Sequence, residues 1–201
     1  LLAVNPFDDP DVVSSKQTTR RLLEGKKEEQ AISIGEIRDD AGHALRMPFA
    51  LVDEDAGVIE QLVRFFQNAG PTNYLTLMPF VHMTDDVQNL LSELVVALRA
   101  VLPLPVILNP GPRYLHSTGQ LHKGGPNTGL YLIITASTDT VLAIPGEPYS
   151  FSDLNNAQAR GDFSSLVALG RQVAHLDLGS SPQQALAAVT AEVQLRWTES
   201  A

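Results

Sequence analysis

The stretch RYLHSTGQLHK, residues 113–123, holds a dense group of side chains that can move protons or bind anions. His116 and His122 titrate near neutral pH, so each could transfer a proton. Arg113 and Lys123 could hold a phosphate or a carboxylate. The GGPNTG segment that follows could turn backbone N–H groups toward an anion. The stretch is therefore either a site for an anionic ligand or a polar surface loop whose glycines only form turns.

A second candidate is Lys16, which follows an acidic cluster near the start of the chain (Asp8, Asp9 and Asp11). A lysine on a helix can stabilise negative charge in a reaction, but most helical lysines are solvated. Three further histidines stand singly beside or inside apolar runs, and we predict core or surface positions for them: His43, His82 and His175. No histidine spacing here matches a metal site, because His116 and His122 lack a nearby carboxylate.

Apolar periodicity predicts the elements that must position these residues. Helices are expected at 10–24, 57–70, 84–102, 152–170 (with a break near Gly161) and 181–197. Strands are expected at 31–37, 47–52, 73–81, 105–109, 129–137 and 173–179. The segment IPGEPYSF, 144–151, is expected to be a turn-rich connection rather than a lid. Nearly all-apolar strands separated by amphipathic helices predict an α/β fold, in which a mixed, largely buried sheet is covered by helices.

The chain divides into three parts by composition. Residues 1–25 are expected to form an N-terminal helical arm, which Asp9 caps and Gly25 ends. The charged segment KKEEQ, 26–30, reads as a linker, and 31–201 as a C-terminal α/β domain. Because the first residue is Leu1 rather than methionine, we expect the chain to be a piece of a longer protein.

Composition excludes several classes of function. The 201 residues are 44% hydrophobic and 18% charged, which is the balance of a globular protein with a core. The net charge of −9 argues against nucleic-acid and membrane partners, since both require a basic surface. The chain has no cysteine, so disulfides and thiolate nucleophiles are excluded, and a cytoplasmic location is predicted. No apolar run is long enough to span a bilayer.

Two stretches resemble phosphoglucose isomerase. NPFDDPDVVSSKQTTRRLL is similar to the C-terminal segment of that family, whose helix carries a catalytic lysine. The match assigns this role to Lys16 and implies that the arm, residues 1–25, is the end of an isomerase module. LHSTGQLHKGG is similar to a family segment of the form Leu-His-Ser-x-Gly-Gln, whose histidine helps to open the sugar ring; the match assigns this role to His116.

The longer pattern GPRYLHSTGQLHKGGPNTGLYLIIT resembles the bifunctional transaldolase/glucose-6-phosphate isomerases, in which a transaldolase barrel precedes an isomerase module. The resemblance covers essentially the whole chain. It implies the C-terminal part of an enzyme that interconverts glucose 6-phosphate and fructose 6-phosphate without metal or organic cofactor. Its partners would be the sugar phosphate and the upstream isomerase and transaldolase domains. The implied substrate-binding residues are Arg113, Ser117, Gln120, His122 and Lys123.

The chain departs from the ordinary family in two respects. Lys16 precedes His116, whereas in ordinary phosphoglucose isomerases the histidine precedes the lysine. No segment matches the one that carries the family's catalytic glutamate, so this base is expected upstream. Two other functions remain open: a non-catalytic structural or regulatory domain that packs on the catalytic part, and a sugar-phosphate binder without turnover.

Overall fold

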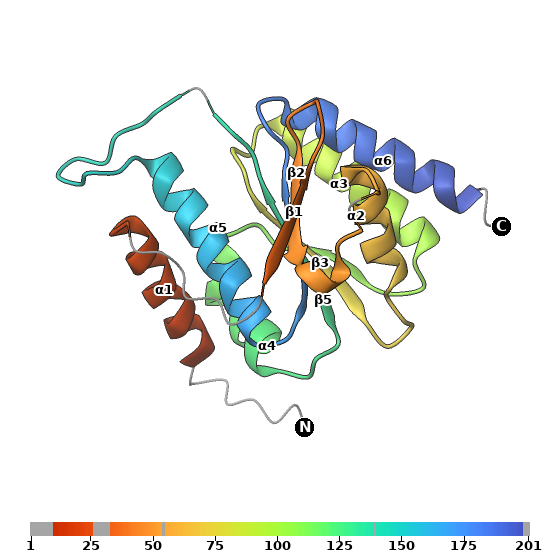
Figure 1. Ribbon diagram of the computed structural model, residues 1–201, viewed down its shortest axis with the longest axis horizontal. Coiled ribbons are helices and arrows are strands. Elements are labelled where there is room, and N and C mark those ends of the chain that lie inside the picture. Colours follow the sequence, from red (N-terminus) through yellow and green to blue (C-terminus); the bar gives the residue numbers. More distant parts are fainter. Residues whose placement is uncertain (1–9, 26–32, 54, 139, 199–201) are drawn as a thin grey trace.

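The computed structural model describes residues 10–25, 33–53, 55–138 and 140–198 (Figure 1). Within these residues the α-helices are α1 Pro10–Leu23, α2 Val58–Gln67, α3 Asp85–Val101, α4 Gly119–Gly124, α5 Phe151–Ala168 and α6 Pro182–Thr198. The strands are β1 Ile34–Arg38, β2 Ala44–Pro48, β3 Tyr74–Phe80, β4 Val106–Leu108, β5 Gly129–Thr135 and β6 Gln172–Asp177. Two 3₁₀ helices, η1 Phe49–Leu51 and η2 Arg113–His116, complete the described elements.

The strands form one mixed sheet in the order β1-β2-β6-β5-β3-β4. The pairs β3–β4, β3–β5 and β5–β6 are parallel, whereas β1–β2 and β2–β6 are antiparallel. The carboxyl ends of β3, β4, β5 and β6 therefore meet at one edge of the sheet. In open α/β sheets this is the edge where ligands bind.

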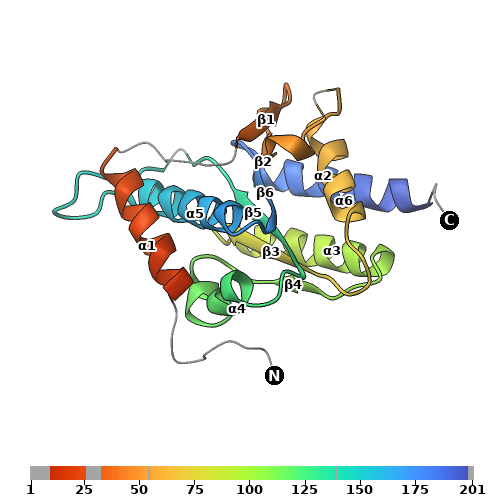
Figure 2. The ribbon, with the colours of Figure 1, turned by 60° about the horizontal axis from the view of Figure 1, so that its bottom comes forward.

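Helices cover the sheet on both faces (Figures 1 and 2). Helices α2, α3 and α6 lie on one side, and α1, α4 and α5 lie on the other. Every residue of β5 is buried, as expected for a central strand between two helical layers. The prediction of a mixed α/β sheet covered by helices is confirmed. No helix among the described residues is long and apolar enough to cross a bilayer.

The alternation of side chains along the strands builds two cores. Leu130, Leu132 and Ile134 of β5 face the larger one, which α2, α3 and α6 complete. Tyr131 and Ile133 face the smaller one, which lies beneath α5. Polar side chains in the smaller core must find partners inside the protein, because burying an unpaired polar group is costly.

The second predicted strand, 47–52, is wrong. The strand is β2, Ala44–Pro48, and the residues after it form η1. A tight turn before Ala44 fixes where β2 begins. In this turn the Asp39 carboxylate accepts a hydrogen bond from the His43 backbone N–H at 2.9 Å. Gly42 within this turn has φ +87°, a conformation that favours glycine. The apolar side chains of Phe49 and Leu51 are exposed rather than buried.

Two other expectations also need correction. The helix α5 has no break at Gly161, since tertiary packing on both sides outweighs the roughly 1 kcal/mol cost of a helical glycine. The stretch of residues 113–123 is not simply a loop between strands, because it holds η2 and most of the short helix α4.

The predicted N-terminal arm forms the helix α1, which packs against α5 and α4 (Figure 2). The proposed cap of this helix, Asp9, lies outside the described residues. Of the acidic cluster, Asp8 also lies outside them. The proposed linker 26–30 also lies outside them. That α1 ends an isomerase module stays a prediction.

Candidate functional site

The residues that the sequence singled out fall into two groups. Arg113, His116 and Ser117 are exposed in or next to η2, at the carboxyl end of β4, and Lys16 is exposed on α1. Gln120 is partly buried on α4. Because α1 packs on α4, which follows η2 closely, the helix of Lys16 and the segment of His116 belong to the same side of the sheet.

His122 and Lys123 have a different environment, inside the smaller core. The Lys123 ammonium is fully buried and lies 2.7 Å from an Asp162 carboxylate oxygen on α5. The other oxygen of that carboxylate accepts a hydrogen bond from the Tyr114 hydroxyl at 2.5 Å. Burial, followed by the Asp162 charge, raises the pKa of Tyr114 well above its usual value of 10, so the phenol stays protonated. This cluster ties η2 and α4 to α5.

His122 belongs to a second buried network. Its Nδ1 lies 2.9 Å from the Tyr74 hydroxyl, and its Nε2 lies 3.3 Å from the Asn109 amide nitrogen. The Tyr74 hydroxyl lies 2.8 Å from that of Tyr131, which donates to the His122 carbonyl at 3.0 Å. One assignment satisfies all of these groups: Nδ1 donates to Tyr74, Tyr74 donates to Tyr131, and Nε2 accepts from Asn109. Burial lowers the His122 pKa to about 4, which keeps the ring neutral.

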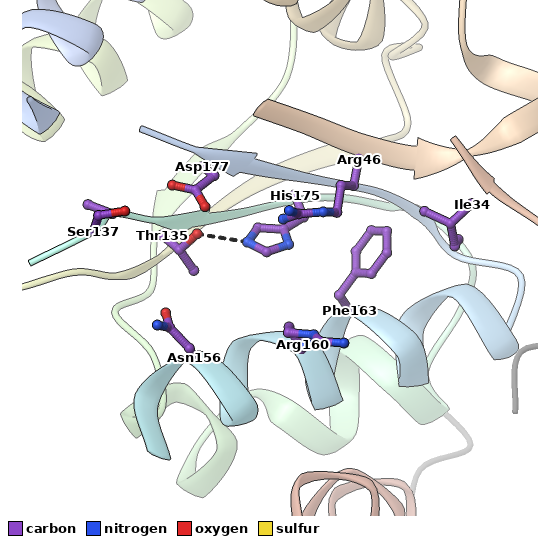
Figure 3. Close-up of a pocket in the computed structure, with 10 residues that line it drawn as sticks. Ile34, Arg46, Thr135, Ser137, Asn156, Arg160, Phe163, His175 and Asp177 are labelled. Carbon is purple, nitrogen blue, oxygen red and sulfur yellow. Dashed lines mark hydrogen bonds between the residues drawn. The ribbon is translucent and has the colours of Figure 1, made fainter. Parts of the chain in front are cut away.

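A cavity of about 480 Å³ lies at the carboxyl ends of β5 and β6, beside α5 (Figure 3). Its position fits the rule for ligand sites in α/β sheets, since Thr135 and Asp177 are the last residues of β5 and β6. Its volume falls within the range of small-molecule pockets. It is lined by Ile34, Arg46, Thr135, Ala136, Ser137, Asn156, Arg160, Phe163, His175 and Asp177. None of the seven site residues predicted from the sequence lines it.

Strand register and helix periodicity place the polar residues of this cavity. Arg46 of β2 lies opposite His175 of β6, and Thr135 of β5 lies opposite Asp177. From the helical side, Asn156 and Arg160 of α5 are one turn apart, and Figure 3 shows both beneath the strand residues. The start of α5 is held by a capping box between Ser150 and Asp153.

The cavity is cationic, although the whole chain is acidic. Its charged lining residues are Arg46, Arg160 and Asp177. Arg46 also forms an ion pair with Glu36 of β1 at the rim. Burial, followed by the charges of Arg46 and Arg160, lowers the pKa of His175 to about 3. Two guanidinium groups around a neutral imidazole form a site that is suited to an anion.

His175 has a hydrogen-bonding atom with no partner among the described residues. Its Nε2 lies 2.9 Å from the Thr135 hydroxyl, but its Nδ1 is buried and unpaired. Only 3% of the residue is exposed. An unpaired polar atom in such a place is costly, and a ligand that paired with it would remove this cost.

Sequence reasoning missed most of this cavity. His175 was expected to be a core or surface histidine, and Arg46, Arg160 and Asp177 carried no motif. The available signal was positional, since Thr135 and Asp177 lie near the carboxyl ends of two expected strands, 129–137 and 173–179. Arg46 could not be placed, because the predicted strand began one residue after it. Among the described residues no group of three or more side chains could hold a metal ion.

Comparisons with known proteins add the fold and no activity. No protein-family model matches the chain, and no curated protein does. The fold is similar to that of the hypothetical protein TT0462 from Thermus thermophilus, with a TM-score of 0.59 and 18% sequence identity. The match covers 74% of this chain and 42% of that one, so the chain spans less than half the length of that protein.

Proposed function

We propose that the cavity binds the phosphate group of a sugar phosphate. The observation that carries the proposal is the buried, unpaired Nδ1 of His175 in a cavity flanked by Arg46 and Arg160. If Nδ1 carries the proton, then it donates to a phosphate oxygen while Nε2 accepts from the Thr135 hydroxyl. Guanidinium groups hold phosphates through charge-assisted hydrogen bonds, and a neutral histidine adds a further donor.

The resemblance supports a separate proposal of an activity, whose residues do not line the cavity. In it, the chain is the C-terminal part of a glucose-6-phosphate isomerase fused to a transaldolase. His116 would move the proton that opens the sugar ring, Lys16 would stabilise the enediolate, and a base from upstream would abstract the proton beside the carbonyl. The exposure of both residues is compatible with these roles.

A second candidate is a binding or regulatory domain without turnover. It is supported by the positions of His122 and Lys123, whose polar groups are engaged inside the protein rather than presented to a ligand. Under this proposal the cavity still binds the sugar phosphate, but the motif of residues 113–123 stabilises the fold.

Calorimetric titration of the chain with glucose 6-phosphate tests the binding proposal. We expect binding by the wild type, and a loss of at least about tenfold in affinity for Arg46→Ala and Arg160→Ala, since hydrogen bonds to charged groups contribute about 1.5–3 kcal/mol. Arg64→Ala is the matched control, because Arg64 makes ion pairs on the surface of α2, away from the cavity. Binding that is absent, or that does not depend on Arg46 and Arg160, contradicts the proposal.

An isomerase assay on the full-length protein then separates the two candidate functions. We expect His116→Ala and Lys16→Ala to lower the turnover of glucose 6-phosphate if the resemblance assigns their roles correctly. Unchanged turnover in both variants would remove these residues from the mechanism and favour the domain without turnover.

A further inference from the structure

The polar residues of the cavity lie at two levels along β6. The inner level is the one around His175, and the outer level is the one around Asp177, the last residue of the strand. His175 and Asp177 are two residues apart on β6 and face the same side of the sheet, which separates them by about 7 Å along the strand. Arg160 and Asn156 are four residues apart on α5, which separates them by about one helical turn. Figure 3 shows Arg160 near His175 and Asn156 near the end that holds Asp177 and Ser137.

The two levels have opposite chemistry. The inner level combines Arg46, Arg160 and the unpaired His175 Nδ1, so it favours an anion. The outer level holds a carboxylate, an amide and a hydroxyl, from Asp177, Asn156 and Ser137 respectively. A phosphate at the outer level would meet the negative charge of Asp177, and this repulsion disfavours it.

Asp177 is oriented to accept hydrogen bonds. One of its carboxylate oxygens accepts from the Gly179 backbone N–H at 3.0 Å, which holds the side chain in place. An ionised carboxylate has about four lone-pair sites, so this bond leaves acceptor capacity for a ligand. The complementary ligand group is a donor, which in a phosphorylated sugar is a hydroxyl.

We infer that the cavity takes its ligand in one direction, with the phosphate at Arg46, Arg160 and His175 and sugar hydroxyls at Asp177. In this arrangement Asp177 determines specificity: it selects phosphate esters that carry hydroxyls over inorganic phosphate. The inference rests on the proposed function, because it requires that the inner level binds a phosphate.

The test compares two probes, glucose 6-phosphate and inorganic phosphate, on the wild type and on Asp177→Asn. The variant keeps an oxygen that can accept from Gly179, so it should fold. We expect the affinity for glucose 6-phosphate to fall roughly 10- to 100-fold, since a hydrogen bond to a charged group is lost. The affinity for inorganic phosphate should stay the same or rise, because a like charge is removed. Asp53→Asn, on the surface beside Arg64, is the matched control.

The outcomes separate this inference from the proposed function. If neither probe binds the wild type, or if both bind independently of Arg46 and Arg160, both proposals are overturned. If both probes bind through the arginines and Asp177→Asn leaves the ratio of the two affinities unchanged, only the role of Asp177 is overturned. The inference is supported if Asp177→Asn lowers the ratio of the affinity for glucose 6-phosphate to the affinity for inorganic phosphate at least about tenfold. The variant should at the same time keep the melting temperature of the wild type.

Discussion

Two buried histidines on the same side of the sheet differ in how their ring nitrogens are hydrogen-bonded. His122 and His175 are both almost completely buried, at 2% and 3% exposed, and burial lowers the pKa of each. Both ring nitrogens of His122 have partners in the protein, in a network that also includes Tyr74 and Tyr131. His175 has one partner, Thr135, and an unpaired Nδ1 beside a cavity.

The difference indicates what each cluster does. Around His122, the donors and acceptors can be assigned so that each ring nitrogen is used, which is the pattern of a stabilising network. The neighbouring pair of Lys123 and Asp162 is likewise complete, since the carboxylate also accepts from Tyr114. Around His175 one ring nitrogen has no partner among the described residues, which is what the proposed ligand site requires. The hydrogen bonds of the ring nitrogens thus distinguish two clusters that each contain a buried histidine.

The largest expected effect comes from breaking the complete cluster. Asp162→Ala would leave the Lys123 ammonium buried without a counter-charge, and the loss of one member of a buried ion pair costs about 3–5 kcal/mol. Urea denaturation should therefore show a fall of this size in the free energy of unfolding.

A double variant provides the control for this prediction. Replacing both charges, with Lys123→Met and Asp162→Leu, should restore most of the lost stability, because no charge then remains unpaired. A cost below about 1 kcal/mol for Asp162→Ala would show that the pair does not hold η2 and α4 on α5.

An intermediate effect is expected from acidification, to which both histidines contribute. Each pKa is lower in the folded state than the ordinary 6.5, to about 4 for His122 and about 3 for His175. The unfolded chain therefore takes up protons first as the pH falls through 6.5. Lowering the pH from 7 to 5 should reduce the free energy of unfolding by roughly 2 kcal/mol for each histidine.

Single variants assign the two contributions. The pH dependence of urea denaturation should become shallower in His122→Phe and, by a similar amount, in His175→Phe. Saturating glucose 6-phosphate should add stability to the wild type and not to His175→Phe, because only His175 belongs to the proposed ligand site. An equal ligand effect in both variants would contradict the comparison.

The smallest effect is expected for Arg160→Ala, at a position two residues from Asp162 on the same helix. Arg160 is exposed at the cavity, so its removal should change the free energy of unfolding by no more than about 0.5 kcal/mol. Asp162→Ala is the internal reference for the same helix. A large loss of stability in Arg160→Ala would mean that the cavity residues support the fold in the way that the His122 network does.

Much of the fold could be predicted from local pattern, and less of the site. The helix over 84–102 was expected from its apolar spacing, and the structure has α3 with Thr84 as its cap, accepting from the Val87 N–H at 3.3 Å. The strand at 47–52 was misplaced because the apolar run MPFALV continues past Pro48, where the structure has η1 instead of a strand. This error displaced Arg46, so the sequence could not indicate which residue lies opposite His175.

The sequence by itself determined the class of fold, the order of the strands and the longer helices, and the concentration of ionisable side chains in residues 113–123. It could do so because apolar period, caps and turn residues are local properties of the chain. Only the tertiary structure decided which of these side chains meet. Lys123 reaches Asp162, and Arg46 reaches the level of His175, through contacts between residues far apart in the chain. These tertiary partners distinguish a polar group that stabilises the fold from one that can bind a ligand. The neighbouring residues in the sequence do not specify such partners.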